Sequence, residues 1–408
     1  MVQRLGKRPD TAVHFGWVSL LQDLGSKMVV PVLTPFLVLQ LGASAFAVGL
    51  IDGLATVSAA LVAPVAGRFA RRRPARWVRV GYGLSSAMKL ALAVATVWPT
   101  VLVIRVLDRA GKGIRDTPRD VLLAAARPDH GRSFGIQQAM DKTGGFLGPL
   151  LGLAVYQLSG ESFDAVFVVA FVPCVVSVLL LWRLPAAGEP TSEALTSEAA
   201  TPRSADPTPE AAPDAAARTT PNQRVALVAV ALHALGFITP SLLLLRALDI
   251  DATVVEVVVG YALLRLVTAI VAYPAGRLVD RYSARLITVT GMAVSAAAIA
   301  LAAVAADPGV VWLALAGVGA ADALTRGPVK AWLLSLGPPE SRGAVLGDRA
   351  AVSGLAAFIG SIAAGAAWSD DGQVVLLVAA GVIAAGCLAA LGVRPAGRPV
   401  APGVDPTG

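Results

Sequence analysis

The chain of 408 residues has little of what many enzymes and secreted proteins rely on. Its two cysteines, Cys174 and Cys387, have no metal-ligand spacing, which argues against a disulfide framework. No glycine-rich loop ends in Gly-Lys-Ser or Gly-Lys-Thr, so ATP is not the expected energy source. Because serine and cysteine nucleophile motifs and His/Glu metal patterns are also missing, we expect neither an enzyme nor a metal or other cofactor.

Charged and aromatic residues are also scarce. They make up 15% and 6% of the chain, against 56% hydrophobic residues, and the mean hydropathy of +0.69 is far above that of soluble proteins. The few rings disfavour flat polyaromatic substrates. Stretches of about 20 apolar residues, enough to cross ~30 Å of hydrocarbon, recur along the chain. They predict an all-α membrane protein with twelve transmembrane helices, near residues 14–39, 44–67, 77–98, 101–125, 135–158, 163–183, 224–245, 254–276, 286–306, 310–335, 343–367 and 373–393.

The basic residues behind the net charge of +7 gather in alternate loops between these segments. They follow the second, fourth, eighth and tenth predicted helices: Arg68, Arg71, Arg72, Arg73, Arg76 and Arg79, then Arg127 and Arg132, then Arg277, Arg281 and Arg285, then Arg342. This positive-inside pattern predicts a multi-pass protein with both termini cytoplasmic. Nucleic acid is not an expected partner, since the basic residues do not share one soluble face.

A central segment divides the predicted helices six and six. Residues 184–223 are rich in Ala, Pro, Thr and Glu with almost no large apolar residues, which is typical of a disordered linker. We therefore expect an N-terminal six-helix bundle over 1–183, a cytoplasmic linker over 184–223, a C-terminal six-helix bundle over 224–394 and a cytoplasmic tail over 395–408. Ala66-Gly67-Arg68 and Ala275-Gly276-Arg277 follow corresponding helices of the two halves. Such internal symmetry is typical of transporters whose site lies between two repeats.

The fourth predicted helix carries a stripe of charge inside the membrane. Its charged residues fall within an arc of about 140°: Arg105, Asp108, Arg109, Lys112, Arg115, Asp116, Arg119 and Asp120. A charge near the bilayer centre costs at least roughly 2.5–3.5 kcal/mol, so the stripe must face protein or a water-filled cavity. Spacings of three and four residues let opposite charges pair: Arg105 with Asp108, Asp108 with Lys112, Lys112 with Asp116, and Asp116 with Arg119.

Two interpretations of the stripe stay open. Its excess of basic residues would suit a cavity wall that attracts an anionic or zwitterionic group, with Arg105, Asp108, Arg109, Lys112 and Arg115 on the substrate path. A static buried network that locks this helix to its neighbours is the alternative.

Other predicted helices add isolated charges. Asp23 and Lys27 lie four residues apart on one face of the first helix, Asp52 lies on the second and Lys89 on the third. A poorly solvated carboxylate has a raised proton affinity, so Asp23 and Asp52 are candidate proton-coupling residues, and Lys27 and Lys89 join the substrate path. Alternatively, Asp23 is permanently paired with Lys27 and never titrates.

The fifth predicted helix is rich in glycine, with Gly135, Gly144, Gly148, Pro149 and Gly152. Glycines four apart let a neighbouring backbone approach closely, and Pro149 frees a backbone carbonyl. Ordinary tight helix packing is the alternative interpretation.

These motifs resemble the major facilitator superfamily over the whole chain. The spacing from Gly135 to Gly152 is similar to the fifth-helix antiporter motif of its drug/proton exporters, with Leu153 in place of a final glycine. Gly276, Asp280 and Arg281 match its cytoplasmic loop motif, and the resemblance implies a gating or structural role for both sets. The first-half loop over 67–73 lacks the expected acid. The fourth-helix block resembles a bacterial branch of the superfamily, in which an acid usually stands at the place of Lys27.

Together the patterns predict two pseudo-symmetric six-helix bundles that form a proton-coupled exporter, or antiporter, of a small organic molecule. We expect it to act by alternating access, as a monomer in the bacterial inner (plasma) membrane, with lipid, protons and the substrate as partners. One alternative is a proton-coupled importer of an anionic metabolite. The other is a non-transporting membrane receptor or scaffold.

Overall fold

The computed structural model describes residues 11–70, 74–126, 130–182, 219–338, 341–369 and 372–393. Some side chains inside helices, including those of residues 63–70 and 130–136 and that of Asp280, lie outside this description. Within the described ranges the chain is helical, with no strand. Most of the predicted linker and all of the predicted tail fall outside these ranges. At the linker's end, however, α8 already begins at Pro221, capped by the side chain of Thr220.

The first half contains the six spanning segments expected from hydropathy. They are α1 (Thr11–Pro35) with the π-helix η1 (Phe36–Gln40), α2 (Ala45–Ala70), α3 (Pro74–Leu92), α4 (Trp98–Ala126), α5 (His130–Leu158) and α6 (Phe163–Trp182). The third helix ends earlier than predicted, at Leu92. The next helix starts at Trp98 with Pro99 in its first turn, where a missing backbone N–H is tolerated.

The second half also has six segments, two of them interrupted. They are α8 (Pro221–Gly236) with α9 (Pro240–Asp249), α10 (Val254–Arg281), α11 (Ala284–Ala303), α12 (Pro308–Arg326) with α13 (Pro328–Ser335), α14 (Arg342–Ala366) and α15 (Gln373–Gly392). The expectation of single helices over 224–245 and 310–335 is wrong. Pro240 and Pro328 cannot donate the backbone hydrogen bond that would continue the preceding helix, and each opens a new one.

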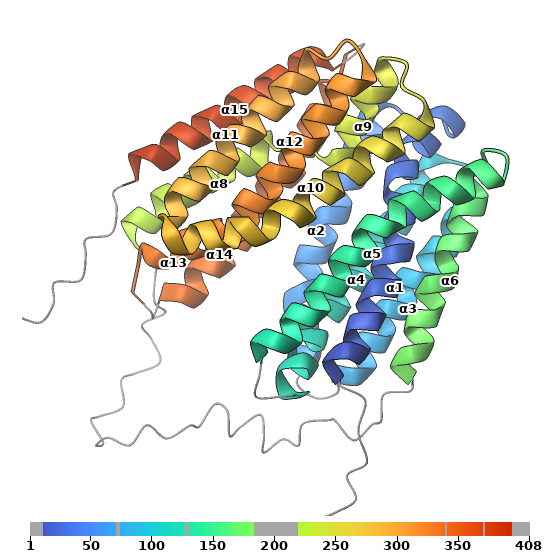
Figure 1. Ribbon diagram of the computed structural model, residues 1–408, viewed down its shortest axis with the longest axis horizontal. Coiled ribbons are helices and arrows are strands. Elements are labelled where there is room, and N and C mark those ends of the chain that lie inside the picture. The colour runs from blue at the N-terminus through green and yellow to red at the C-terminus, as the bar shows by residue number, and fades with distance from the viewer. Residues whose placement is uncertain are drawn as a thin grey trace, which may run out of the picture.

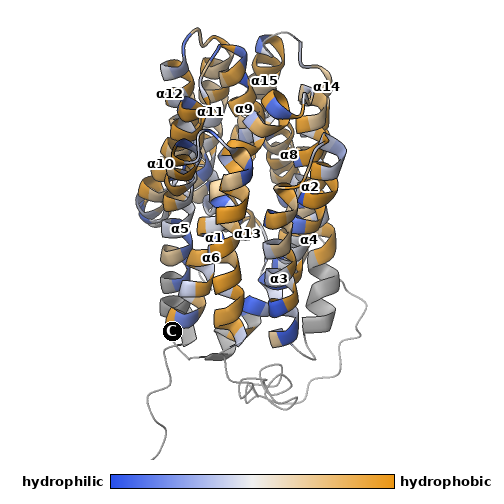
Figure 2. Ribbon diagram, turned by 90° about the vertical axis from the view of Figure 1, so that its right-hand side faces the viewer, coloured by the Kyte–Doolittle hydropathy of each residue, from blue (hydrophilic) through white to orange (hydrophobic). Residues whose placement is uncertain are grey.

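The outer surface of the helices suits a lipid environment. Figure 2 shows hydrophobic residues along most of the helix lengths, with hydrophilic residues gathered near several helix ends. Large apolar side chains are exposed there, for example Leu61 and Trp182, each 68% exposed. Among the described residues, eight segments are long and apolar enough to cross a membrane. The remaining four, α1, α3, α4 and α5, all belong to the first half.

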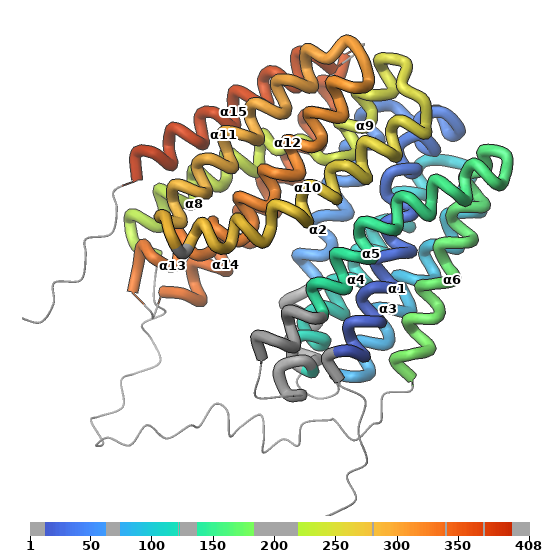
Figure 3. The backbone as a smooth tube through the Cα atoms, viewed as in Figure 1, coloured from blue at the N-terminus to red at the C-terminus, as the bar shows by residue number. Residues whose placement is uncertain are grey.

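The two halves occupy separate sides of the molecule (Figures 1 and 3). They lie together at the end that contains α9 and diverge toward the end that contains α13 and the start of α1 (Figure 1). At the closed end, α2 packs against α14, α5 against α10, and α1 against α9. The Thr34 hydroxyl donates to the Ser241 carbonyl across this contact over 3.5 Å.

Small residues let the halves approach so closely at this end. A Cβ atom on Gly49 of α2 would collide with the Ser361 carbonyl of α14. One on Gly365 of α14 would lie 2.6 Å from the Ala45 carbonyl. The contact therefore depends on backbone approaching backbone, as is usual where helices pack within a membrane.

Candidate functional site

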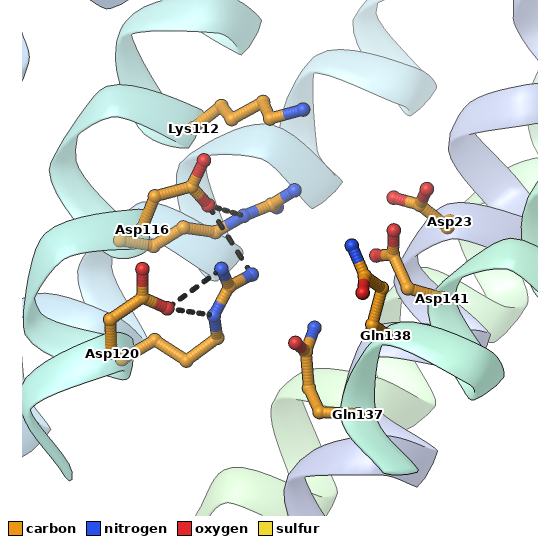
Figure 4. A pocket seen from close by; sticks show the side chains of 9 residues that line it. Asp23, Lys112, Asp116, Asp120, Gln137, Gln138 and Asp141 are labelled. Atoms are coloured by element: carbon orange, nitrogen blue, oxygen red, sulfur yellow. Dashed lines mark hydrogen bonds and ion pairs between the residues drawn. The ribbon is translucent and has the colours of Figure 1, made fainter. Parts of the chain in front are cut away.

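A polar cavity lies inside the first half, between α1, α4 and α5. Its volume of about 320 Å³ falls in the lower part of the roughly 300–1,000 Å³ range of small-molecule sites. The residues that line it are all polar or charged: Asp23, Lys112, Arg115, Asp116, Arg119, Asp120, Gln137, Gln138 and Asp141. Figure 4 shows the labelled residues of α4 on one wall, facing those of α1 and α5 on the other.

A second, smaller cavity of about 20 Å³ shares Asp23, Lys112 and Arg115 with the first. It continues along α1 and α4 to Ser26, Lys27, Val30, Ser85, Arg105, Asp108 and Arg109. We call the two cavities together the polar chamber. The chamber brings together every predicted substrate-path residue except Lys89.

Lys89 lies directly behind the chamber wall, where it forms a buried ion-pair network with α4. Its Nζ lies 2.5 Å from Oδ1 of Asp108, and Nη1 of Arg105 lies 3.3 Å from Oδ2 of the same carboxylate. The Ser85 hydroxyl donates to the Asp108 carbonyl over 2.9 Å. Lys89, Arg105 and Asp108 are 2%, 4% and 8% exposed, so this part of the stripe matches the buried-network interpretation.

A second network follows the same helix toward the open end of the molecule. Arg119 contacts Asp116 at 3.4 Å and Asp120 at 2.9 Å, while Nε of Arg115 lies 3.7 Å from Asp116 (Figure 4). The Arg115 guanidinium also stacks over Tyr82 of α3, with 4.3 Å between Cζ and the ring centroid. This stacking orients a buried cation toward the chamber.

Two of the four pairs expected along the fourth helix are present, Arg105–Asp108 and Asp116–Arg119. The pairs Asp108–Lys112 and Lys112–Asp116 are not among the ion pairs of the described residues. The Asp108 carboxylate is instead occupied by Lys89 from α3, and Asp116 is approached by the two arginines. Lys112 therefore keeps its charge directed into the chamber (Figure 4).

Asp23 and Lys27 both line the chamber without forming an ion pair with each other in the described structure. Both are half-buried. Their charges act on each other, and the positive charge of Arg265, on α10 in the other half, acts on both. The hypothesis that Asp23 is permanently locked to Lys27 therefore has no ion pair to support it.

Asp52, the other proton-coupling candidate, lies apart from these residues. It is half-buried on α2 and lines neither cavity, although its charge acts on Arg105. The two carboxylates, which the sequence analysis made equal candidates, therefore differ in the structure, since Asp23 lines the chamber and Asp52 does not.

The glycines of the fifth helix bring α5 against α1. A Cβ on Gly148 would lie 2.6 Å from the Leu24 carbonyl and 2.7 Å from Cβ of Lys27, and Gly144 and Gly152 meet Leu20 and Met28 in the same way. Pro149 is buried beside them. The surroundings of Gly135 lie outside the described residues. The motif therefore fixes the helix that carries Asp23 and Lys27.

The loop motif of the second half lies away from the chamber. A Cβ on Gly276 would meet nothing within 4 Å, and Arg281 is exposed at the end of α10. The side chain of Asp280 is outside the described residues, so its gating role remains a prediction.

Three residues of the larger cavity were not predicted from the sequence: Asp141, Gln137 and Gln138 on α5. The Gln137 amide donates to the Ser19 hydroxyl of α1 over 2.9 Å. The spacing of these three residues places them near one face of a spanning helix, which is the signal that could have found them.

The sequence matches the model of a large family of membrane proteins. The family described as Major Facilitator Superfamily matches residues 15–232 and 224–408. An uncharacterized MFS-type transporter of Methanocaldococcus jannaschii is 30% identical over 186 residues, which cover 44% of this chain and 46% of that protein. An uncharacterized protein of Mycobacterium tuberculosis is 30% identical over 173 residues, 41% of this chain and 42% of that protein. The alignments thus span about half the length of these relatives.

Solved structures share the fold over nearly the whole chain. The nucleoside transporter NupG superposes with a TM-score of 0.73 at 14% identity, covering 94% of this chain and 98% of that one. A bacterial homolog of the human lysosomal transporter Spinster, inward-facing and occupied, gives 0.75 at 15% identity, with coverage of 95% and 97%. A D-xylose-proton symporter gives 0.70 at 14% identity, with coverage of 95% and 98%. At such identities the likeness shows the fold of two six-helix bundles.

Proposed function

Because this chain belongs to the Major Facilitator Superfamily, we propose that it is a secondary transporter of a small molecule and not an enzyme. The polar chamber is the observation that carries the proposal. It is a charged cavity of small-molecule size within an apolar helical bundle. Such costly intramembrane charge is retained where it contacts a substrate or an ion.

Alternating access supplies the mechanism. The halves are in contact at one end, through α2 with α14 and α5 with α10, and apart at the other (Figure 1). Transport requires a second state in which these contacts open and the opposite ends close, and the two states must differ by only a few kcal/mol. Backbone contacts between small residues such as Gly49 and Gly365 are suited to this, because no buried charge is stranded when they part.

Asp23 is the proposed site of proton coupling. Its half-buried carboxylate lines the chamber without an ion-pair partner among the described residues. Cations on α1, α4 and α10 act on it, so a change in their distances as the chamber changes sides would change its proton affinity. A lysine and two arginines from α4 line the same cavity, so loss of the proton changes the charge that a substrate meets. Asp52 lines neither cavity and is the weaker candidate.

Export is the proposed direction, and it is supported by the fifth-helix glycine spacing that resembles the drug/proton antiporters. The positive-inside pattern of the basic loops supports a cytoplasmic position, in a bacterial inner membrane, for the open end where α2 and α4 finish. Import of an anionic metabolite is the second candidate. The excess of cations around the smaller cavity favours it, five basic residues against two acidic ones.

The test is the accumulation of a labelled compound panel in an efflux-deficient bacterial host. Wild type is compared with Asp23→Asn and with Asp52→Asn as the matched control, at equal expression, with and without a protonophore. Export predicts lower accumulation in the wild type and in Asp52→Asn, abolished by the protonophore and by Asp23→Asn. Raised accumulation in the wild type supports the importer. No protein-dependent change for any compound contradicts transport and favours a receptor or scaffold.

A further inference from the structure

The polar chamber is divided by charge along the membrane axis. The smaller cavity is lined by five basic residues and two acidic ones, whereas the larger one has three basic residues and four acidic ones. Asp23 lies one helical turn from Lys27 on α1, which separates the two regions by about 6 Å along the helix. The chamber therefore has a cationic part and an anionic part that share Asp23, Lys112 and Arg115.

The cationic part contains charge that the protein does not neutralise. Within the described structure no carboxylate is paired with Lys27, Arg109 or Lys112, although Lys89, Arg105 and Arg119 are all paired. Arg115 lines both cavities at 5% exposure, and its buried Nη1 has no hydrogen-bond partner in the described structure. Leaving buried donors and charges unmatched costs free energy, which a bound anionic group would recover.

Two of the four acidic residues of the anionic part, Asp116 and Asp120, lie on α4, where arginines pair with them, and the other two lie on the wall built by α1 and α5. Asp23 and Asp141 face the side of Lys112 and Asp116 in Figure 4. Neither carboxylate is in an ion pair of the described residues, and the charge of Asp23 acts on Asp141. Two such carboxylates attract a cation or share a proton.

We propose, building on the proposed function, that the substrate is a small zwitterion. Its acidic group binds Lys27, Arg109 and Lys112, and its ammonium group binds Asp23 and Asp141. A proton at Asp23 or Asp141 removes the charge that holds the ammonium group, so proton and substrate compete for one place. Competition of this kind is what proton/substrate exchange requires, because each bound partner then excludes the other. A singly charged anion would leave Asp141 unused.

Thermal unfolding of the purified full chain in detergent tests this with three four-carbon probes. They are 4-aminobutyrate, which carries both charges, butyrate, which carries the acid alone, and butylamine, which carries the ammonium alone. One charge-assisted contact is worth about 10- to 100-fold in affinity, so 4-aminobutyrate should raise the Tm at concentrations lower by that factor. The control variant is Asp164→Asn, which removes an exposed carboxylate outside the chamber and should respond to the three probes as the wild type does.

Two variants separate binding from damage to the fold. Asp141→Asn should lose the preference for 4-aminobutyrate over butyrate. Lys112→Met should lose the preference for 4-aminobutyrate over butylamine. Partial unfolding would abolish every response rather than alter the two preferences in opposite ways. If butyrate and 4-aminobutyrate raise the Tm of the wild type equally, the site binds anions alone. If butylamine and 4-aminobutyrate raise it equally, the site binds cations alone. Either result overturns the proposal, as does no shift with any probe.

The accumulation assay keeps the two proposals apart. Protein-dependent transport restricted to singly charged compounds overturns the zwitterion and leaves the transporter standing. Selective binding of 4-aminobutyrate without any protonophore-sensitive transport overturns the transporter and leaves the binding site.

Discussion

Removal of the Asp108 carboxylate should destabilise the first half more than any other single charge change on α4. Asp108 is 8% exposed and faces two cations, Lys89 at 2.5 Å and Arg105 at 3.3 Å. Asp108→Asn keeps the shape of the side chain but leaves two nearly inaccessible positive charges without a counter-ion. Breaking a buried pair by removing one partner costs about 3–5 kcal/mol.

The matched control is Asp120→Asn on the same helix. The Asp120 side chain is 51% exposed in its pair with Arg119, and exposed pairs are worth about 0–1 kcal/mol. The free energy of unfolding of both variants is measured by denaturant titration in the same detergent, following helical circular dichroism.

A double-mutant cycle checks the cause of the loss. Lys89→Met removes one of the stranded cations, so the Lys89→Met/Asp108→Asn protein should be more stable than the sum of the two single changes predicts. Strict additivity, or equal losses from Asp108→Asn and Asp120→Asn, would refute the reasoning that burial makes this ion pair important.

Three further predictions concern helix packing. Gly148→Ala places a Cβ within 2.7 Å of Lys27 and should cost about 1–3 kcal/mol of stability in the same titration, whereas Gly83→Ala, with nothing within 4 Å, should cost nothing. The valine side chain of Gly49→Val would collide with the Ser361 carbonyl and should open the closed end. A cysteine introduced by Thr34→Cys, at a position 1% exposed, should then react faster with maleimide than the same cysteine in a protein that keeps Gly49. An unchanged rate would count against the assigned contact. Arg246→Lys removes the guanidinium that donates hydrogen bonds to the carbonyls of Ala302, Ala303 and Ala305, and should lower the free energy of unfolding by about 1.5–3 kcal/mol. Arg281→Lys, at an exposed helix end, should have no measurable effect.

Hydropathy predicted the fold well because a bilayer imposes one dominant rule on every spanning segment. The six-and-six division and most helix ends follow from it, although four segments of the first half, α1, α3, α4 and α5, are too polar to count as spans by apolar length alone. The breaks before Pro240 and Pro328 were not predicted, because hydropathy continues through them. Only backbone hydrogen bonding distinguishes a broken span from a continuous one.

The candidate site was predicted in part. Helical periodicity correctly grouped the charges of α4 on one side, but it describes one helix at a time. The partners of Asp108 were therefore sought on the same helix, at Arg105 and Lys112. The Arg105 pair is present, but in place of Lys112 the structure uses Lys89 from the neighbouring helix. Asp141 was missed for the same reason, since its importance comes from facing Asp23 across a cavity and not from its own neighbours in sequence.

The ion pair between α3 and α4 also bears on how the protein enters the membrane during synthesis. A charged residue costs up to roughly 2.5–3.5 kcal/mol on insertion scales, the full cost applying at the centre of a lone helix. Neither α3, which carries Lys89 in its last turn, nor α4 is among the described segments apolar enough to cross unaided. Joined by Lys89 and Asp108, the two helices cancel one charge of each before either meets lipid. Their short connection over residues 93–97 allows them to leave the translocon as one hairpin. We therefore expect α3 and α4 to enter the membrane together, held by the same contact that stabilises the finished bundle.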